Sequence, residues 1–78
     1  MHITHFTLEA VRDGKTEYIG KTPIREQALH VAETYRNKNR VSVIVCAHCV
    51  LNDGTTELRR VAYNADGTKT ILWQTCID

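Results

Sequence analysis

Three Asp-Gly pairs constrain the fold of this chain more than any other feature of its sequence. They fall at Asp13-Gly14, Asp53-Gly54 and Asp66-Gly67, and each lies between two runs of strand-forming residues. Tight hairpin turns need residues that tolerate positive φ, and Asp-Gly is among the pairs that meet this need best. Each pair therefore predicts a β-hairpin, and the last two hairpins share a strand and form a meander.

The segments between these turns predict five strands and one helix. The helix covers residues 22–36, where Thr22 can cap the first turn and Pro23 suits the first helical position. An apolar stripe recurs at helical spacing along it, and the polar and basic residues 37–40 end it. The strands are expected at residues 3–11, 16–21, 41–51, 57–63 and 68–77.

The resulting element order, β-β-α-β-β-β, predicts an α+β fold. We expect a five-stranded antiparallel sheet with the helix on one face. With only 78 residues, of which 42% are hydrophobic and 24% charged, the chain has the composition of one globular domain spanning residues 1–78. The expected core consists of Phe6, Leu8, Ile24, Ala28, Val31, Val43, Val45, Ile71 and Trp73.

The predicted strand at residues 41–51 is largely apolar on both of its faces. Its odd positions are all apolar, from Val41 to Leu51, and its even positions include Ile44, Cys46, His48 and Val50. Such a strand is usually covered on both sides, yet only one helix is available. We therefore expect the even-numbered face to bind a protein partner or a second copy of the chain. The alternative is that long side chains such as Arg59, Arg60 and Lys69 shield it within a monomer.

Charge adds little to the choice of partner. Ten Lys and Arg residues against nine Asp and Glu leave a formal charge of +1, so no strong field attracts nucleic acid or anionic lipid. The basic residues that gather after the helix and on a strand are instead predicted to form the polar rim of a protein interface. These are Arg36, Lys38, Arg40, Arg59 and Arg60. A small nucleic-acid-binding domain, with Tyr63 and Trp73 for base stacking, is an alternative function.

The cysteines offer a second alternative. Cys46, Cys49 and Cys76, with a histidine, have residue types that could ligate a structural zinc ion. However, Cys46 and Cys49 are three residues apart in a strand, so their side chains should point to opposite faces of the sheet. We therefore interpret them as buried reduced thiols and predict no metal and no cofactor.

No catalytic group of residues emerges from the sequence. The aspartates of the Asp-Gly pairs are explained by turn chemistry, and the glycines lack the spacing of a phosphate-binding loop. We therefore predict that the chain is not an enzyme. It also has no apolar run long enough to span a membrane and no signal-peptide pattern at Met1–Ala10, which predicts a cytoplasmic protein without a membrane partner.

In size and element order the chain resembles small phage-encoded inhibitors of bacterial defence systems, such as anti-CRISPR proteins. The resemblance lies in the helix that begins Thr22-Pro23-Ile24-Arg25-Glu26-Gln27-Ala28-Leu29, which follows one Asp-Gly hairpin and precedes a meander with two more. It is architectural and carries over no site residue. It implies a protein that inhibits a host nucleic-acid-handling complex by occupying one of its surfaces.

Overall fold

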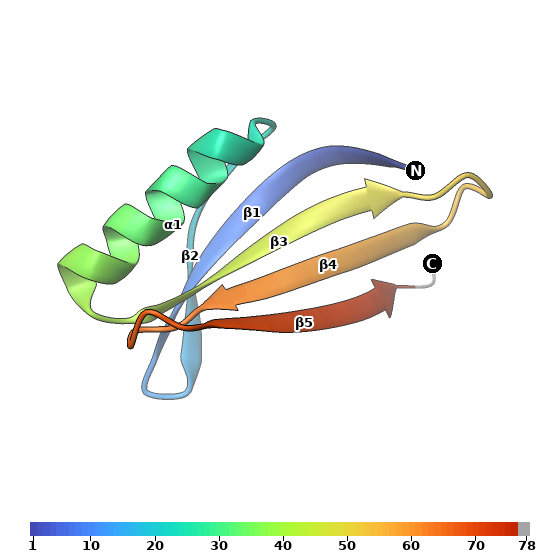
Figure 1. Ribbon diagram of the computed structural model, residues 1–78. Coiled ribbons are helices and arrows are strands. Elements are labelled where there is room, and N and C mark those ends of the chain that lie inside the picture. The colour runs from blue at the N-terminus through green and yellow to red at the C-terminus, as the bar shows by residue number, and fades with distance from the viewer. Residues whose placement is uncertain (77–78) are drawn as a thin grey trace.

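The computed structural model describes the backbone of residues 1–76 and the side chains of residues 1–72. Five strands and one helix make up the described part of the chain, in the predicted order (Figure 1). Their bounds are β1 His2–Arg12, β2 Lys15–Thr22, α1 Arg25–Asn39, β3 Ser42–Val50, β4 Thr56–Tyr63 and β5 Lys69–Cys76. The strands form one sheet in the order β2-β1-β3-β4-β5, and all neighbouring pairs are antiparallel. The predicted α+β fold class is confirmed.

All three Asp-Gly pairs form the hairpin turns expected of them. Asp13 and Gly14 both have positive φ, of 50° and 76°, which is the signature of a two-residue hairpin loop between β1 and β2. Gly54 and Gly67 have φ of 86° and 92° in the loops that follow β3 and β4.

The two later turns are built alike. In each, the glycine N–H donates to a carbonyl three residues earlier, in the pairs Gly54–Leu51 and Gly67–Asn64. The Asp66 carboxylate then accepts hydrogen bonds from the backbone N–H and the hydroxyl of Thr68, and Asp53 does the same with Thr55. These hydrogen bonds, led by the threonine hydroxyls, lower the pKa of both aspartates.

The helix begins later than predicted. Thr22 is the last residue of β2, where it pairs with Phe6, and Ile24 rather than Thr22 is the residue before the first helical turn. A proline disfavours helical geometry in the residue that precedes it, so Pro23 keeps Thr22 in the sheet. The Thr22 hydroxyl still organises the junction, because it accepts from the Ile24 N–H and donates to the Gln27 side chain.

The helix also ends later than predicted. Residues 37–39, which were expected to terminate it, belong to the helix, and Asn39 is its last residue. The stop comes from Arg40, which adopts the left-handed conformation with φ of 55° and ψ of 44° and donates its N–H to the Arg36 carbonyl.

The core lies between α1 and the centre of the sheet. Five of the predicted core residues are buried there: Phe6, Leu8, Ala28, Val43 and Val45. Val31 is partly buried and packs against them. The prediction was wrong for Ile24, which is 54% exposed before the helix, and for Ile71, which is 67% exposed on the edge strand β5. The side chain of Trp73 and all of Ile77 lie outside what the structure describes.

The helix covers only part of one face of the sheet. It packs on β1, β2, β3 and β4, and within the described residues it does not reach β5. Figure 1 shows α1 on the side of the molecule away from β5, and the helix packs most extensively on the central strand β3. Ile71 is therefore exposed because the helix does not extend over its strand.

Candidate protein-binding surface

The face of the sheet opposite α1 has no second layer of structure in the described part of the chain, and we call it the open face. Strand alternation and cross-strand register decide which side chains belong to it. Those that matter below are Tyr18 from β2; His5, Thr7 and Glu9 from β1; Ile44, Cys46, His48 and Val50 from β3; Leu58, Arg60 and Ala62 from β4; and Leu72 from β5.

The centre of the open face is apolar and closely packed. Ile44 is 8% exposed and Cys46 is 9% exposed, although no helix lies above them. Both lie on the central strand, so side chains from two neighbouring strands flank each of them. Ile44 lies between Glu9 and Ala62, and Cys46 between Thr7 and Arg60. Of the three long side chains named in the alternative for a monomer, only Arg60 lies on this face, beside Cys46, whereas Arg59 and Lys69 lie on the face that carries the helix.

Two charged side chains of opposite sign border this apolar centre. Glu9 stands beside Ile44 on the β1 side, and Arg60 stands beside Cys46 on the β4 side. Both are half-buried. Among the described residues, the Glu9 carboxylate has no hydrogen-bond or ion-pair partner. The apolar centre of the open face is thus bordered by an acid on one side and a base on the other.

A pair of stacked imidazoles lies further along the same face. The rings of His5 and His48 face each other across β1 and β3 with centroids 4.2 Å apart and an angle of 15° between their planes. A hydrogen bond of 3.0 Å joins His48 Nε2 to Thr7 Oγ1. Burial lowers the pKa of His48, and the neighbouring His5 lowers it further. Both effects favour the neutral form of the partly buried His48 ring.

The largest exposed apolar side chains of the open face lie toward its two edges. Tyr18, on the edge strand β2, is 61% exposed, and Leu72, on the opposite edge strand β5, is 37% exposed. Leu58 and Val50 are half-buried between them. The surface therefore has a packed apolar centre, a charged border and apolar side chains at both margins, which is the pattern of many protein interfaces.

The predicted basic rim does not form one surface. Lys38 and Arg40 are exposed near the C-terminal end of α1, with Arg36 half-buried beside them. Arg59 and Arg60 are adjacent in β4, so they point to opposite faces of the sheet, and Arg59 contacts Glu57 at 2.9 Å on its own face. Only Arg60 shares the open face with Ile44, Cys46, His48 and Val50.

The cysteines of β3 are separated in the same way. Cys46 lies on the open face, whereas Cys49 is fully buried on the other side and its thiol donates to the Ala47 carbonyl at 3.7 Å. The two sulfurs thus cannot ligate one ion without a change in the strand. No group of three or more potential metal ligands occurs among the described residues. The Cys76 side chain is outside the described part.

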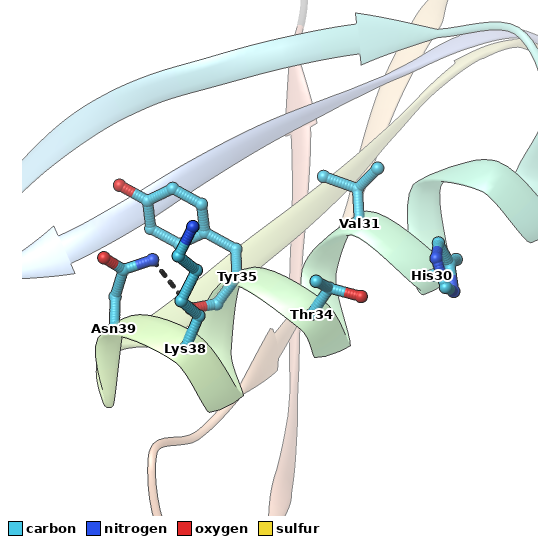
Figure 2. A pocket seen from close by; sticks show the side chains of 6 residues that line it. All are labelled: His30, Val31, Thr34, Tyr35, Lys38 and Asn39. Atoms are coloured by element: carbon cyan, nitrogen blue, oxygen red, sulfur yellow. Dashed lines mark hydrogen bonds between the residues drawn. The ribbon is translucent and has the colours of Figure 1, made fainter.

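A hollow lies along one flank of α1. It has a volume of about 500 Å³ and is open to solvent. Figure 2 shows Tyr35, Lys38 and Asn39 together at one end of it and His30 apart from them. The Asn39 side-chain amide donates to the Tyr35 carbonyl at 3.1 Å, so this contact completes the helix end. The residues that line the hollow are His30, Val31, Thr34, Tyr35, Lys38 and Asn39.

Sequence reasoning missed several residues of the open face. Glu9, Tyr18 and Leu72 were not among the predicted site residues. Alternation within residues 3–11 already places His5, Thr7 and Glu9 on one side of their strand. What the sequence does not reveal is that this strand pairs with β3 in a register that sets Glu9 beside Ile44.

Comparisons with known proteins give no relative for this chain: no family model, no curated protein and no solved structure matches it. Among the described residues, no helix is long and apolar enough to cross a membrane.

Proposed function

We propose that this chain is a non-enzymatic protein-binding module and that the open face is its binding surface. The observation that carries the proposal is an apolar sheet face, centred on Ile44 and Cys46, without a second layer of structure over it in the described residues. Sheets with one uncovered face usually carry polar residues there. An apolar centre bordered by charges favours a partner surface instead.

The type of partner is proposed from the resemblance in architecture. A small module that covers a surface of a host nucleic-acid-handling complex, of the CRISPR type, would act as a stoichiometric inhibitor encoded by a phage or mobile element. Such an inhibitor needs one protein-binding face and no active site. The apolar centre of the open face supports the first of these requirements.

A pull-down with two matched variants tests the proposal. Leu72 and Ile71 are neighbours in β5, both exposed, and they point to opposite faces of the sheet. Leu72→Lys places a charge on the open face, and Ile71→Lys places the same charge on the other side. The tagged wild-type chain and both variants are incubated with host lysate, with and without nuclease, and the retained proteins are identified by mass spectrometry.

We expect the wild-type chain and Ile71→Lys to retain the same protein after nuclease treatment, and Leu72→Lys to lose it. If both variants retain the protein equally well, the binding surface lies elsewhere than on the open face. Retention that disappears with nuclease would favour the nucleic-acid alternative, and a steep salt dependence of oligonucleotide binding would then support it. If a CRISPR-type complex is retained, its cleavage of target DNA should fall as the chain is added.

A further inference from the structure

We propose that two copies of this chain associate through the free edge of β5, which pairs with its own counterpart in antiparallel fashion and joins the two sheets into one. The two-fold axis is perpendicular to the sheet, so both open faces lie on the same side and stay uncovered. The inference is therefore independent of the proposed function. It rests on the contrast between the two edge strands and on the direction of the backbone groups of β5.

The two edge strands differ in how well they resist pairing with a further strand. The strand β2 carries Lys15, Glu17 and Lys21, and its pairing with β1 contains a register shift after Leu8. Charged side chains and bulges are usual means by which edge strands avoid another sheet. By contrast, β5 has one charged residue, Lys69, at its first position, and its 8 residues pair with β4 without a register shift. The edge of β5 is therefore the one that can accept another strand.

The hairpin before β5 shows which backbone groups of the strand face its free edge. The Asn64 N–H donates to the Thr68 carbonyl at 2.9 Å, so Thr68 directs its backbone groups toward the β4 side. In an antiparallel ladder this direction alternates from one residue to the next. The odd-numbered residues of β5 therefore direct their N–H and C=O groups away from β4, and these residues are Lys69, Ile71, Trp73 and Thr75. Within the described residues the helix does not reach β5, so it does not cover this edge.

One register pairs all four of these residues with residues of the second copy. Lys69 lies opposite Thr75 of the second copy, Ile71 lies opposite its Trp73, and the two-fold axis repeats both pairs. Each pair exchanges two backbone hydrogen bonds, roughly eight in all. A shift by two residues in either direction leaves at least one of the four without a counterpart in β5. In the full register, Leu72 lies on the axis opposite its own counterpart.

The side chains of β5 and β4 suit this register. Leu72, which is partly exposed on the open face, meets a second Leu72 there. The two Lys69 residues are about 20 Å apart, at opposite ends of the paired strands. On the helix side, Lys69 is in line with Glu57 of the second copy, an opposite charge that also contacts Arg59 of its own chain. The two Arg60 residues, one beside each Leu72, are three strand spacings or about 14 Å apart, beyond the screening length of about 8 Å.

Cysteine crosslinking tests the register. Leu72→Cys places two thiols on the axis, where the Cα atoms of a non-hydrogen-bonded pair are about 4.5 Å apart and a disulfide can form. Thr70→Cys is the control, because it lies on the same face but is about 13 Å from its counterpart, too far for a disulfide. Both variants carry Cys76→Ser, and Cys46 and Cys49 are buried. After mild oxidation, we expect a covalent dimer of Leu72→Cys and a monomer of Thr70→Cys on a non-reducing gel.

Sedimentation equilibrium over a concentration series tests the dimer without a disulfide. We expect the wild-type chain to dimerise reversibly. Ile71→Pro removes an N–H that faces the free edge and leaves the hydrogen bonds between β4 and β5 in place. It should weaken the dimer by a factor on the order of 10 to 100, because symmetry removes two hydrogen bonds. Ile71→Ala loses the same side chain but keeps the N–H, so it should still dimerise. Circular dichroism checks that each variant is folded.

A wild-type chain that is monomeric at every concentration would overturn the edge dimer, and so would equal crosslinking of the two cysteine variants. A folded Ile71→Pro chain that dimerises as strongly as the wild type would also overturn it. If Ile71→Pro does not fold, the two cysteine variants decide. None of these results would contradict the proposed function, because the open face is complete on each copy. Leu72→Lys is unsuitable as a test of the dimer, because it changes the open face as well as the axis.

Discussion

At the scale of single residues, the stacked histidines are the most unusual feature of the open face. Two neutral imidazoles can stack with little cost, whereas protonation adds a charge that is partly removed from water and faces a second titratable ring. His48 also keeps a hydrogen bond to Thr7 through Nε2. These contacts favour the neutral ring in the folded state.

The lowered pKa of His48 predicts that the protein becomes less stable as the solution is acidified. Above the ordinary histidine value of 6.5, the ring is neutral in both the folded and the unfolded chain, so this contribution is complete. As the pH falls below 6.5, the unfolded chain binds the proton first, and the free energy of unfolding decreases until the folded ring is protonated too. Urea unfolding of the wild-type chain and of His48→Gln between pH 8 and pH 5 measures this.

The His48→Gln variant should show a flatter dependence of the free energy of unfolding on pH in that window. Equal slopes for the wild-type chain and His48→Gln would contradict the assignment of the effect to the stacked pair.

At the scale of elements, the backbone conformation at turns and helix ends determines where each segment stops. Asp-Gly pairs supply positive φ at the three hairpin loops, but the helix end uses an arginine for the same purpose. A residue with a β-carbon is strained in the left-handed region, and glycine is not. Arg40 thus adopts the left-handed conformation that glycine usually adopts at this position.

Arg40→Gly should therefore stabilise the protein. The strain removed is roughly 1 kcal/mol, and part of the gain is lost to the greater freedom of glycine in the unfolded chain, so we expect an increase of about 0.5 kcal/mol in the free energy of unfolding. Arg40→Ala removes the same charge and keeps the β-carbon, so it serves as the control and should give no such gain. Chemical denaturation of the three proteins gives the comparison. If Arg40→Ala also increases the free energy of unfolding, the gain comes from removing the charge and not from relieving backbone strain.

At the scale of the whole molecule, the placement of α1 determines which apolar residues are buried. Leu8 is 2% exposed between the helix and the sheet, whereas Ile71 belongs to a strand that the helix does not reach. Leu8→Ala should reduce the free energy of unfolding by about 2–5 kcal/mol, which is the usual cost of a cavity in a core. Ile71→Ala should change it by less than about 0.5 kcal/mol. Thermal denaturation of both variants tests the prediction, and a large loss for Ile71→Ala would place that residue in a core.

The loss expected for Leu8→Ala is a large share of the total stability of a chain this size, about 0.05–0.15 kcal/mol per residue. Leu8→Met, which nearly conserves volume, is the milder companion variant and should cost less than about 1.5 kcal/mol. It keeps the comparison measurable if the alanine variant is largely unfolded.

The sequence by itself determined the local features of this protein. The Asp-Gly turns, the alternation within each strand and the helical stripe depend on interactions between residues close in the chain, so the hairpins, the fold class and the divergence of Cys46 from Cys49 could be predicted. The exact start of the helix could not, because Thr22 is held by its pairing with Phe6 in a neighbouring strand.

Only the tertiary structure decided which residues share the open face and how they lie across it. Glu9 stands beside Ile44 because β1 inserts between β2 and β3, with register shifts on both of its sides, after Ile3 and after Leu8. Each shift moves side chains relative to the neighbouring strand, and no local sequence pattern predicts the shift. The exposure of Ile71 and the separation of Arg59 from the helix-end cations have the same origin. They depend on where a distant element packs, which is a property of the assembled sheet.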